Sequence, residues 1–136
     1  MDLKVLATAL LAALCGSACD NSTTAITPTA PIVTTTQNFA DSIGVNGGET
    51  FQFSSTGRGP VTATVTTLNP DTAVIGLAIG TWNGLFCQQI LAKDDATQGT
   101  QITGAVSAVG NLCLRIYDST SKLTGPVAFS VDVSHP

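Results

Sequence analysis

The stretch AVIGLAIGTWNGLFCQQ, residues 73–89, is the longest nearly uncharged apolar run outside the N-terminus. Large and small side chains alternate along its first half, which is typical of a β-strand with one buried face and one smooth face. The large residues are Ile75, Leu77 and Ile79, and the small residues between and beside them are Val74, Gly76, Ala78 and Gly80. The following Trp82-Asn83-Gly84 predicts a hairpin turn, after which the chain returns through Phe86.

A second strong strand pattern, NLCLRIYD at residues 111–118, supplies a partner for Cys87. Its alternation turns leucine and isoleucine inward and turns Cys113 outward. We therefore expect a Cys87–Cys113 disulfide on an outer face of the domain rather than in its core. A two-cysteine metal site is the alternative, and it lacks a nearby histidine or further cysteine.

Composition favours an exported all-β domain. Of the 136 residues, 43% are hydrophobic and only 10% are charged, and threonine, valine and glycine are abundant. Threonine and valine favour strands, and glycine favours turns. The net charge is -4, so no basic patch exists to bind phosphates, and nucleic acid is excluded as an expected partner.

Period-two patterns separated by turn residues extend along the rest of the chain, with no helical period after residue 37. A polar loop is expected at residues 93–99. Eight or nine short strands fit an antiparallel β-sandwich of jelly-roll or immunoglobulin-like type. The expected strands are the central run and residues 38–45, 50–55, 61–68, 86–92, 100–106, 111–117 and 127–133.

Residues 1–18 predict a cleaved export signal, in which Lys4 precedes a ten-residue apolar run. That run is too short to span a bilayer. The small residues directly before Cys19 resemble a bacterial lipobox, which implies cleavage there and acylation of Cys19. The alternative is ordinary secretory cleavage near Ala18, which would leave a free thiol.

Residues 19–37 are expected to form a tether for the domain at 38–136. The segment is rich in threonine, contains Pro28 and Pro31, and carries no charge after Asp20. Several acyl chains would anchor it stably to the cell envelope, and an exported compartment permits the disulfide. Both the inner and the outer membrane remain options.

Three segments carry a family likeness in order: ETFQFSSTGRGPVTATVTTL, AVIGLAIGTWNG and AVSAVGNLCLRIYDSTSKLTGPVAFSVDV. Together they resemble the bacterial pre-peptidase C-terminal domain, whose pattern ends in a glycine, an apolar-Arg-apolar-Tyr strand and an alternating strand. Gly110, Arg115 and Tyr117 match this ending, while Leu112-Cys113 replaces the usual aromatic residue. The resemblance implies a non-catalytic β-sandwich accessory module with a role in binding, secretion or maturation.

Catalytic patterns find little support in the sequence. The sole histidine, His135, is the penultimate residue, where chain ends usually fray. Neither an HExxH motif nor a phosphate-binding loop is present. We therefore expect a protein that is not an enzyme.

Two groups of residues are candidates for ligand binding. An exposed Trp82 beside Asn83, with Tyr117, would suit stacking against a sugar; the alternative is that Trp82 packs over the smooth strand face or caps the core. Four carboxylates could bind calcium with help from carbonyl groups, and the alternative is that they are ordinary polar loop tips. These carboxylates are Asp71, Asp94, Asp95 and Asp118.

The sequence thus predicts a non-catalytic cell-envelope lipoprotein whose β-sandwich mediates protein or surface interactions. A secreted or anchored carbohydrate-binding module is the alternative. The expected partners are the membrane, through the N-terminal lipid, and a protein or glycan ligand.

Overall fold

The alternating patterns form eight β-strands in the computed structural model, which describes residues 29–136. The expected signal, Cys19 and most of the tether lie outside the described residues. The strands are β1 (Thr35–Ile43), β2 (Gly48–Ser55), β3 (Gly59–Asn69), β4 (Ile75–Trp82), β5 (Cys87–Ala96), β6 (Gln101–Val106), β7 (Gly110–Tyr117) and β8 (Val127–His135). A short 3-10 turn, η1 (Ser119–Ser121), follows β7.

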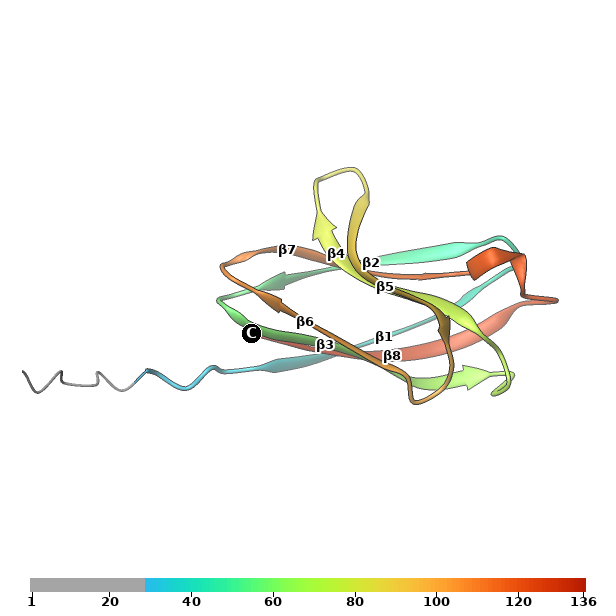
Figure 1. Ribbon diagram of the computed structural model, residues 1–136, viewed down its shortest axis with the longest axis horizontal. Coiled ribbons are helices and arrows are strands. Elements are labelled where there is room, and N and C mark those ends of the chain that lie inside the picture. Colours follow the sequence, from blue (N-terminus) through green and yellow to red (C-terminus); the bar gives the residue numbers. More distant parts are fainter. Residues whose placement is uncertain (1–28) are drawn as a thin grey trace, which may run out of the picture. The chain divides into compact units, whose positions relative to one another are not determined.

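Two four-stranded antiparallel sheets form a sandwich, as the sequence predicts (Figure 1). One sheet has the order β1-β8-β3-β6 and the other β2-β7-β4-β5. The core lies between them and takes its large apolar side chains from the inward positions of both sheets. Among its fully buried members are Val61, Val65, Ile75, Leu77, Leu114, Ile116, Val131 and Val133.

A group of phenylalanines joins the two sheets near one edge. Phe39 of β1 lies 5.1 Å from Phe51 of β2, measured between ring centroids, and Phe51 lies 6.0 Å from Phe129 of β8. Tilted and edge-on pairs at these separations are favourable. Both aromatic residues of β2, Phe51 and Phe53, therefore face the core.

The central strand β4 differs from its predicted character, because both of its faces are buried. Ile75, Leu77 and Ile79 enter the core as expected. The small residues form the smooth opposite face as expected, and that face is covered by groups from the two neighbouring strands, β7 and β5. Two links cross over β4 in this way.

The first link is made by Tyr117 at the end of β7. Tyr117 is paired in register with Gly76 of β4, and its ring lies so close that a Cβ on Gly76 would be 2.3 Å from a ring carbon. The phenol reaches beyond β4 and donates a hydrogen bond to Asp94 of β5. Glycine at position 76 thus permits a side chain of β7 to contact β5.

The second link is the predicted disulfide. Cys113 of β7 is paired with Gly80 of β4 and is bonded to Cys87 of β5, with a Cα–Cα separation of 5.7 Å. Both cysteines are buried, yet they are outside the main core cluster, so the disulfide lies on the outer face of its sheet as expected.

The hairpin between β4 and β5 bends to make this disulfide. The register between the two strands shifts at Ile79 and Gly80. A Cβ on Gly80 would be 2.0 Å from the carbonyl oxygen of Gln88, so the backbone of β5 approaches β4 where glycine leaves room. The bend brings Cys87 to Cys113, although β4 lies between their strands.

One predicted loop is wrong over part of its length. Residues 93–96 belong to β5, so Lys93, Asp94 and Asp95 lie on a strand and the connecting turn shortens. The charged composition suggested a loop, but β5 is the edge strand of its sheet, and charged side chains are common on edge strands.

The close approach at Gly80 predicts a large effect of adding a single methyl group. We expect Gly80→Ala to lower the free energy of unfolding by about 2–3 kcal/mol, because the neighbour is backbone and has little freedom to move. Chemical denaturation of the oxidised protein would measure the change.

Gly104→Ala is the matched control, since the nearest atom to a Cβ there is a side-chain carbon of Leu91 at 3.8 Å. We expect this variant to be as stable as the wild type or more stable by up to about 1 kcal/mol. Equal stability of the two alanine variants would contradict the described path of β5.

Candidate functional site

The strand register places five segments at one end of the sandwich, which we call the entry end because the chain enters β1 there. Three of these segments meet around Gly59, because a Cβ on this residue would contact both Ile32 and Pro136. The segments are the incoming chain at 31–34, the β2–β3 turn at 56–58, the β4–β5 hairpin tip at 83–86, the β6–β7 turn at 107–109, and Pro136. In Figure 1 the incoming chain, the C-terminus and the β6–β7 turn lie on the left, and the hairpin tip projects from the top, to the right of them.

Exposed apolar side chains gather toward this end. In the described part of the chain, seven large hydrophobic residues are exposed, and six of them lie on or next to the entry-end segments. We call these six the apolar patch: Ile32, Val33, Leu85, Phe86, Ile90 and Val109. The seventh, Val45, lies in the β1–β2 turn at the opposite end. A concentration of this kind is typical of an interaction surface.

A groove lies between two residues of the apolar patch, Ile90 of β5 and Val109 of the β6–β7 turn. Its volume is about 350 Å³, and it lies between the β4–β5 hairpin and the β6–β7 turn. Ile90 and Val109 form part of its lining, together with Val61, Ile79, Thr81 and Val106. The hairpin and the turn therefore belong to one continuous surface.

Charged side chains are distributed in the opposite way to the exposed apolar ones, because they are nearly absent from the entry end. No charged residue occurs from position 72 to position 92, and the entry-end segments contain a single charged side chain, Arg58. The seven carboxylates of the described chain all lie elsewhere. The domain therefore has an apolar end with a single charged side chain and an acidic remainder.

The tip of the hairpin is held by the side chain of Asn83. Its Oδ1 accepts hydrogen bonds from the backbone N–H groups of Leu85, at 2.9 Å, and Phe86, at 3.0 Å. The N–H of Asn83 donates to the carbonyl of Phe86. Three of the four backbone donors of the tip are thus satisfied within it, while the side chains of Leu85 and Phe86 face outward.

The three residues considered for sugar binding are not brought together. Trp82 is half-buried at the end of β4, next to the exposed Asn83. Tyr117 is paired with Gly76, six positions away along the same strand, and it is Tyr117 rather than Trp82 that covers the small-residue face. Asn83 uses its side-chain oxygen to hold the turn.

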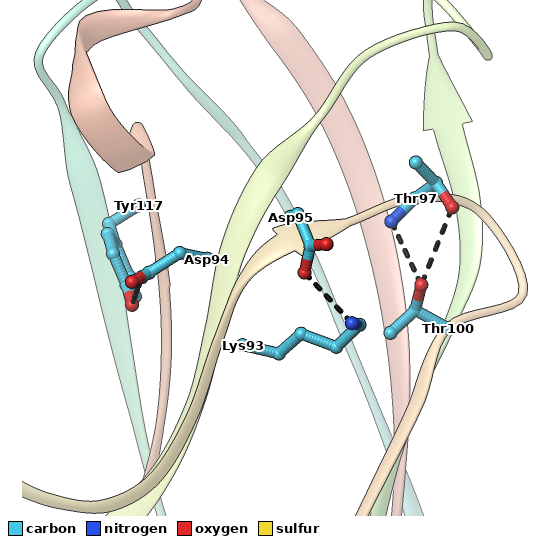
Figure 2. Close-up of polar contacts among 6 residues, drawn as sticks. All are labelled: Lys93, Asp94, Asp95, Thr97, Thr100 and Tyr117. Carbon is cyan, nitrogen blue, oxygen red and sulfur yellow. Dashed lines mark hydrogen bonds and ion pairs between the residues drawn. The ribbon is translucent and has the colours of Figure 1, made fainter.

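The four carboxylates considered for calcium are not brought together, and Figure 2 shows the separate partners of two of them, Asp94 and Asp95. Because Asp94 and Asp95 are neighbours on a strand, they point to opposite faces: Asp94 accepts from Tyr117, and Asp95 pairs with Lys93 at 2.8 Å. The Lys93 ammonium lowers the pKa of Asp95. In the described residues, no group of three or more His, Cys, Asp or Glu side chains is placed to hold a metal ion.

Asp118 has a structural environment of its own. Its carboxylate accepts backbone hydrogen bonds from Asn46, at 2.8 Å, and from Lys122 and Leu123. The bond from Asn46 is the main cause that lowers the pKa of Asp118. This side chain therefore ties the β1–β2 turn to the loop after β7, while Asp71 lies exposed in the β3–β4 loop.

His135 differs from the frayed end that its position suggests. It is the last residue of β8, pairs in register with Thr35, and is buried. Its ring lies 5.0 Å from that of Phe53, and its Nδ1 is 3.1 Å from the carbonyl oxygen of Pro136. The length of β1 explains why His135 belongs to a strand, because β1 pairs with β8 as far as His135 itself.

The sequence interpretation missed the apolar patch. Phe86 was assigned to a strand, and Leu85 was not singled out. The sequence did contain a signal for the patch. Hairpin tips are normally polar, whereas here the Asn-Gly turn is followed directly by the apolar pair Leu-Phe.

The Tyr117–Asp94 link predicts an unusual titration of the only tyrosine in the chain. Burial, followed by the hydrogen bond and the negative charge of Asp94, raises the pKa of Tyr117 from 10.0 to about 12. The stabilisation that accompanies this shift is complete below pH 10 and is lost as the pH rises through 12. Phenolate absorbance of the native protein should therefore appear near pH 12, and that of the denatured chain near 10.

Asp94→Asn should lower the pKa of Tyr117 without restoring its ordinary value, because burial persists. Asp95→Asn is the control, since its carboxylate pairs with Lys93, and it should leave the titration unchanged. An identical tyrosine titration in Asp94→Asn and the wild type would show that the link does not form.

No known family model matches the chain, and no curated protein is significantly similar to it in sequence.

Proposed function

We propose that this protein is a non-catalytic lipoprotein of the cell envelope, whose β-sandwich mediates interactions with a surface or a protein. The observation that carries the proposal is the apolar patch at the entry end. Exposed apolar side chains are costly to maintain in water, and their concentration on one end of a small domain favours a binding role.

One further feature supports export. The disulfide is compatible with an oxidising compartment outside the cytoplasm. Among residues 29–136, no helix has the length and apolar character needed to cross a membrane. Cys19, directly after small residues, is the proposed attachment point, and the chain reaches the domain at the end that carries the patch.

The resemblance to the pre-peptidase C-terminal domain belongs to this proposal as well. A two-sheet antiparallel sandwich is the architecture that the resemblance implies, and an accessory module needs a binding surface but no catalytic group. Within that proposal, this chain would be a free-standing version attached to the envelope by its own lipid.

A carbohydrate-binding module receives less support. Its favourable observation is the partly exposed Trp82 at the end of β4. However, sugar sites combine aromatic rings with convergent polar groups, whereas the groove is lined mainly by aliphatic side chains.

The intact mass of the protein recovered from its native envelope tests the proposal. We expect the mass of residues 19–136 with added fatty-acyl groups and two hydrogens fewer, for the disulfide. Cys19→Ser should abolish the acylated product. An unmodified mass that begins near residue 19, found in soluble extract, would contradict the tethered lipoprotein.

A further inference from the structure

We propose that the entry end of the domain lies against a phospholipid bilayer, with the hairpin tip at residues 83–86 inserted among the lipid headgroups and upper acyl chains. The proposal rests on the proposed function for the lipid tether, and on the described structure for the choice of surface. It assigns Leu85 and Phe86 as the inserted side chains.

The shape and polarity of the hairpin favour insertion. The tip projects beyond its sheet (Figure 1), and the side chain of Leu85 is 86% exposed while that of Phe86 is 59% exposed. No charge lies within the hairpin from residue 72 to residue 92, so nothing charged has to leave water when the tip enters an apolar phase. Leucine and phenylalanine are among the residues that membranes accept most readily.

Most backbone donors of the tip have partners within it, which lowers the cost of moving the tip into a medium with few hydrogen-bond partners. In lipid, each backbone polar group must be satisfied by the protein itself. The N–H groups of Asn83, Leu85 and Phe86 all have partners inside the tip.

The position of Trp82 agrees with insertion of the tip among the headgroups and upper acyl chains. It is half-buried, three residues from Leu85, at the base of the tip. Tryptophan is enriched at the boundary between membrane and water, where its ring is apolar and its N–H can still find a partner. The one tryptophan of the chain would therefore lie at headgroup level.

The distribution of charge orients the rest of the domain. The seven described carboxylates lie outside the entry-end segments, so the acidic part of the domain points away from the anionic headgroups of a bacterial membrane. The single charge at the entry end is Arg58, whose sign is favourable there. The other described basic side chains, Lys93, Arg115 and Lys122, lie away from the entry end, so the orientation rests on the seven carboxylates that outnumber them there.

The remaining members of the apolar patch extend the contact. Ile32 and Val33 belong to the incoming chain, and Val109 lies in the turn across the groove from the hairpin. The chain enters the domain at this end, so a lipid-anchored N-terminus and an inserted hairpin can engage the same membrane. The tether would raise the local concentration of the hairpin at the surface, so that a weak insertion suffices.

Trp82 provides a native probe for the test. The acylated full-length protein is reconstituted into vesicles of phosphatidylethanolamine and phosphatidylglycerol that contain a lipid with a spin label near the headgroup. We expect a blue shift of tryptophan emission and quenching by the spin-labelled lipid. Leu85→Ser combined with Phe86→Ser should lose both effects, while Val45→Ser, which changes an exposed apolar residue at the opposite end, should retain them.

The outcomes separate this proposal from the proposed function. Acylated protein that enters vesicles while Trp82 shows no lipid quenching would overturn the insertion and leave the tether intact. Absence of acylation in the recovered protein would overturn the tether instead. A third outcome would be protection of Trp82 from quenching by aqueous iodide in native envelopes but not in pure lipid vesicles. That result would assign the hairpin to a protein partner and would also overturn the insertion.

Discussion

The rest of this structure depends on one constraint, which is that the outer face of β4 carries small residues. Gly76 and Gly80 leave room for groups that would otherwise collide with side chains, and each is paired with a β7 residue that reaches across to β5. Tyr117 makes this contact through a hydrogen bond to Asp94, and Cys113 makes it through the disulfide. Three strands are therefore joined on the outer face of one sheet, in addition to their backbone ladders and to the core on the inner face.

This arrangement determines how the hairpin is presented. A disulfide between residues 26 positions apart contributes about 3–4 kcal/mol on the chain-entropy model, and here it also holds one strand of the hairpin near its tip. The edge strand β5 bends toward β7 instead of continuing in the plane of the sheet. The exposed tip is thus supported by a covalent bond at its base and by Asn83 within it. A supported tip can expose leucine and phenylalanine without collapsing onto the domain.

The fold followed from local patterns, whereas the surface did not. Alternation along residues 61–68 and 111–117 identifies inward side chains directly, because a strand has only two faces. The same rule showed that Gly76, Ala78 and Gly80 share a face, but not what covers it, since the covering groups come from positions distant in the chain. The charged side chains at residues 93–95 led to the wrong prediction of a loop, because an edge strand tolerates charged side chains that a central strand does not. The apolar patch depends on strand register, which brings residues 32, 85 and 109 to one end and which a single sequence does not determine.

The path of β5 across β4 at Gly80 is the central claim, and proton–proton contacts in solution test it most directly. The α-protons of Gly80 should show nuclear Overhauser effects to the backbone protons of Gln89, and the β-protons of Cys87 should show them to those of Cys113. A hairpin that continues in the plane of its sheet, with Cys87 remote from Cys113 and the outer side of Gly80 open to solvent, would contradict it.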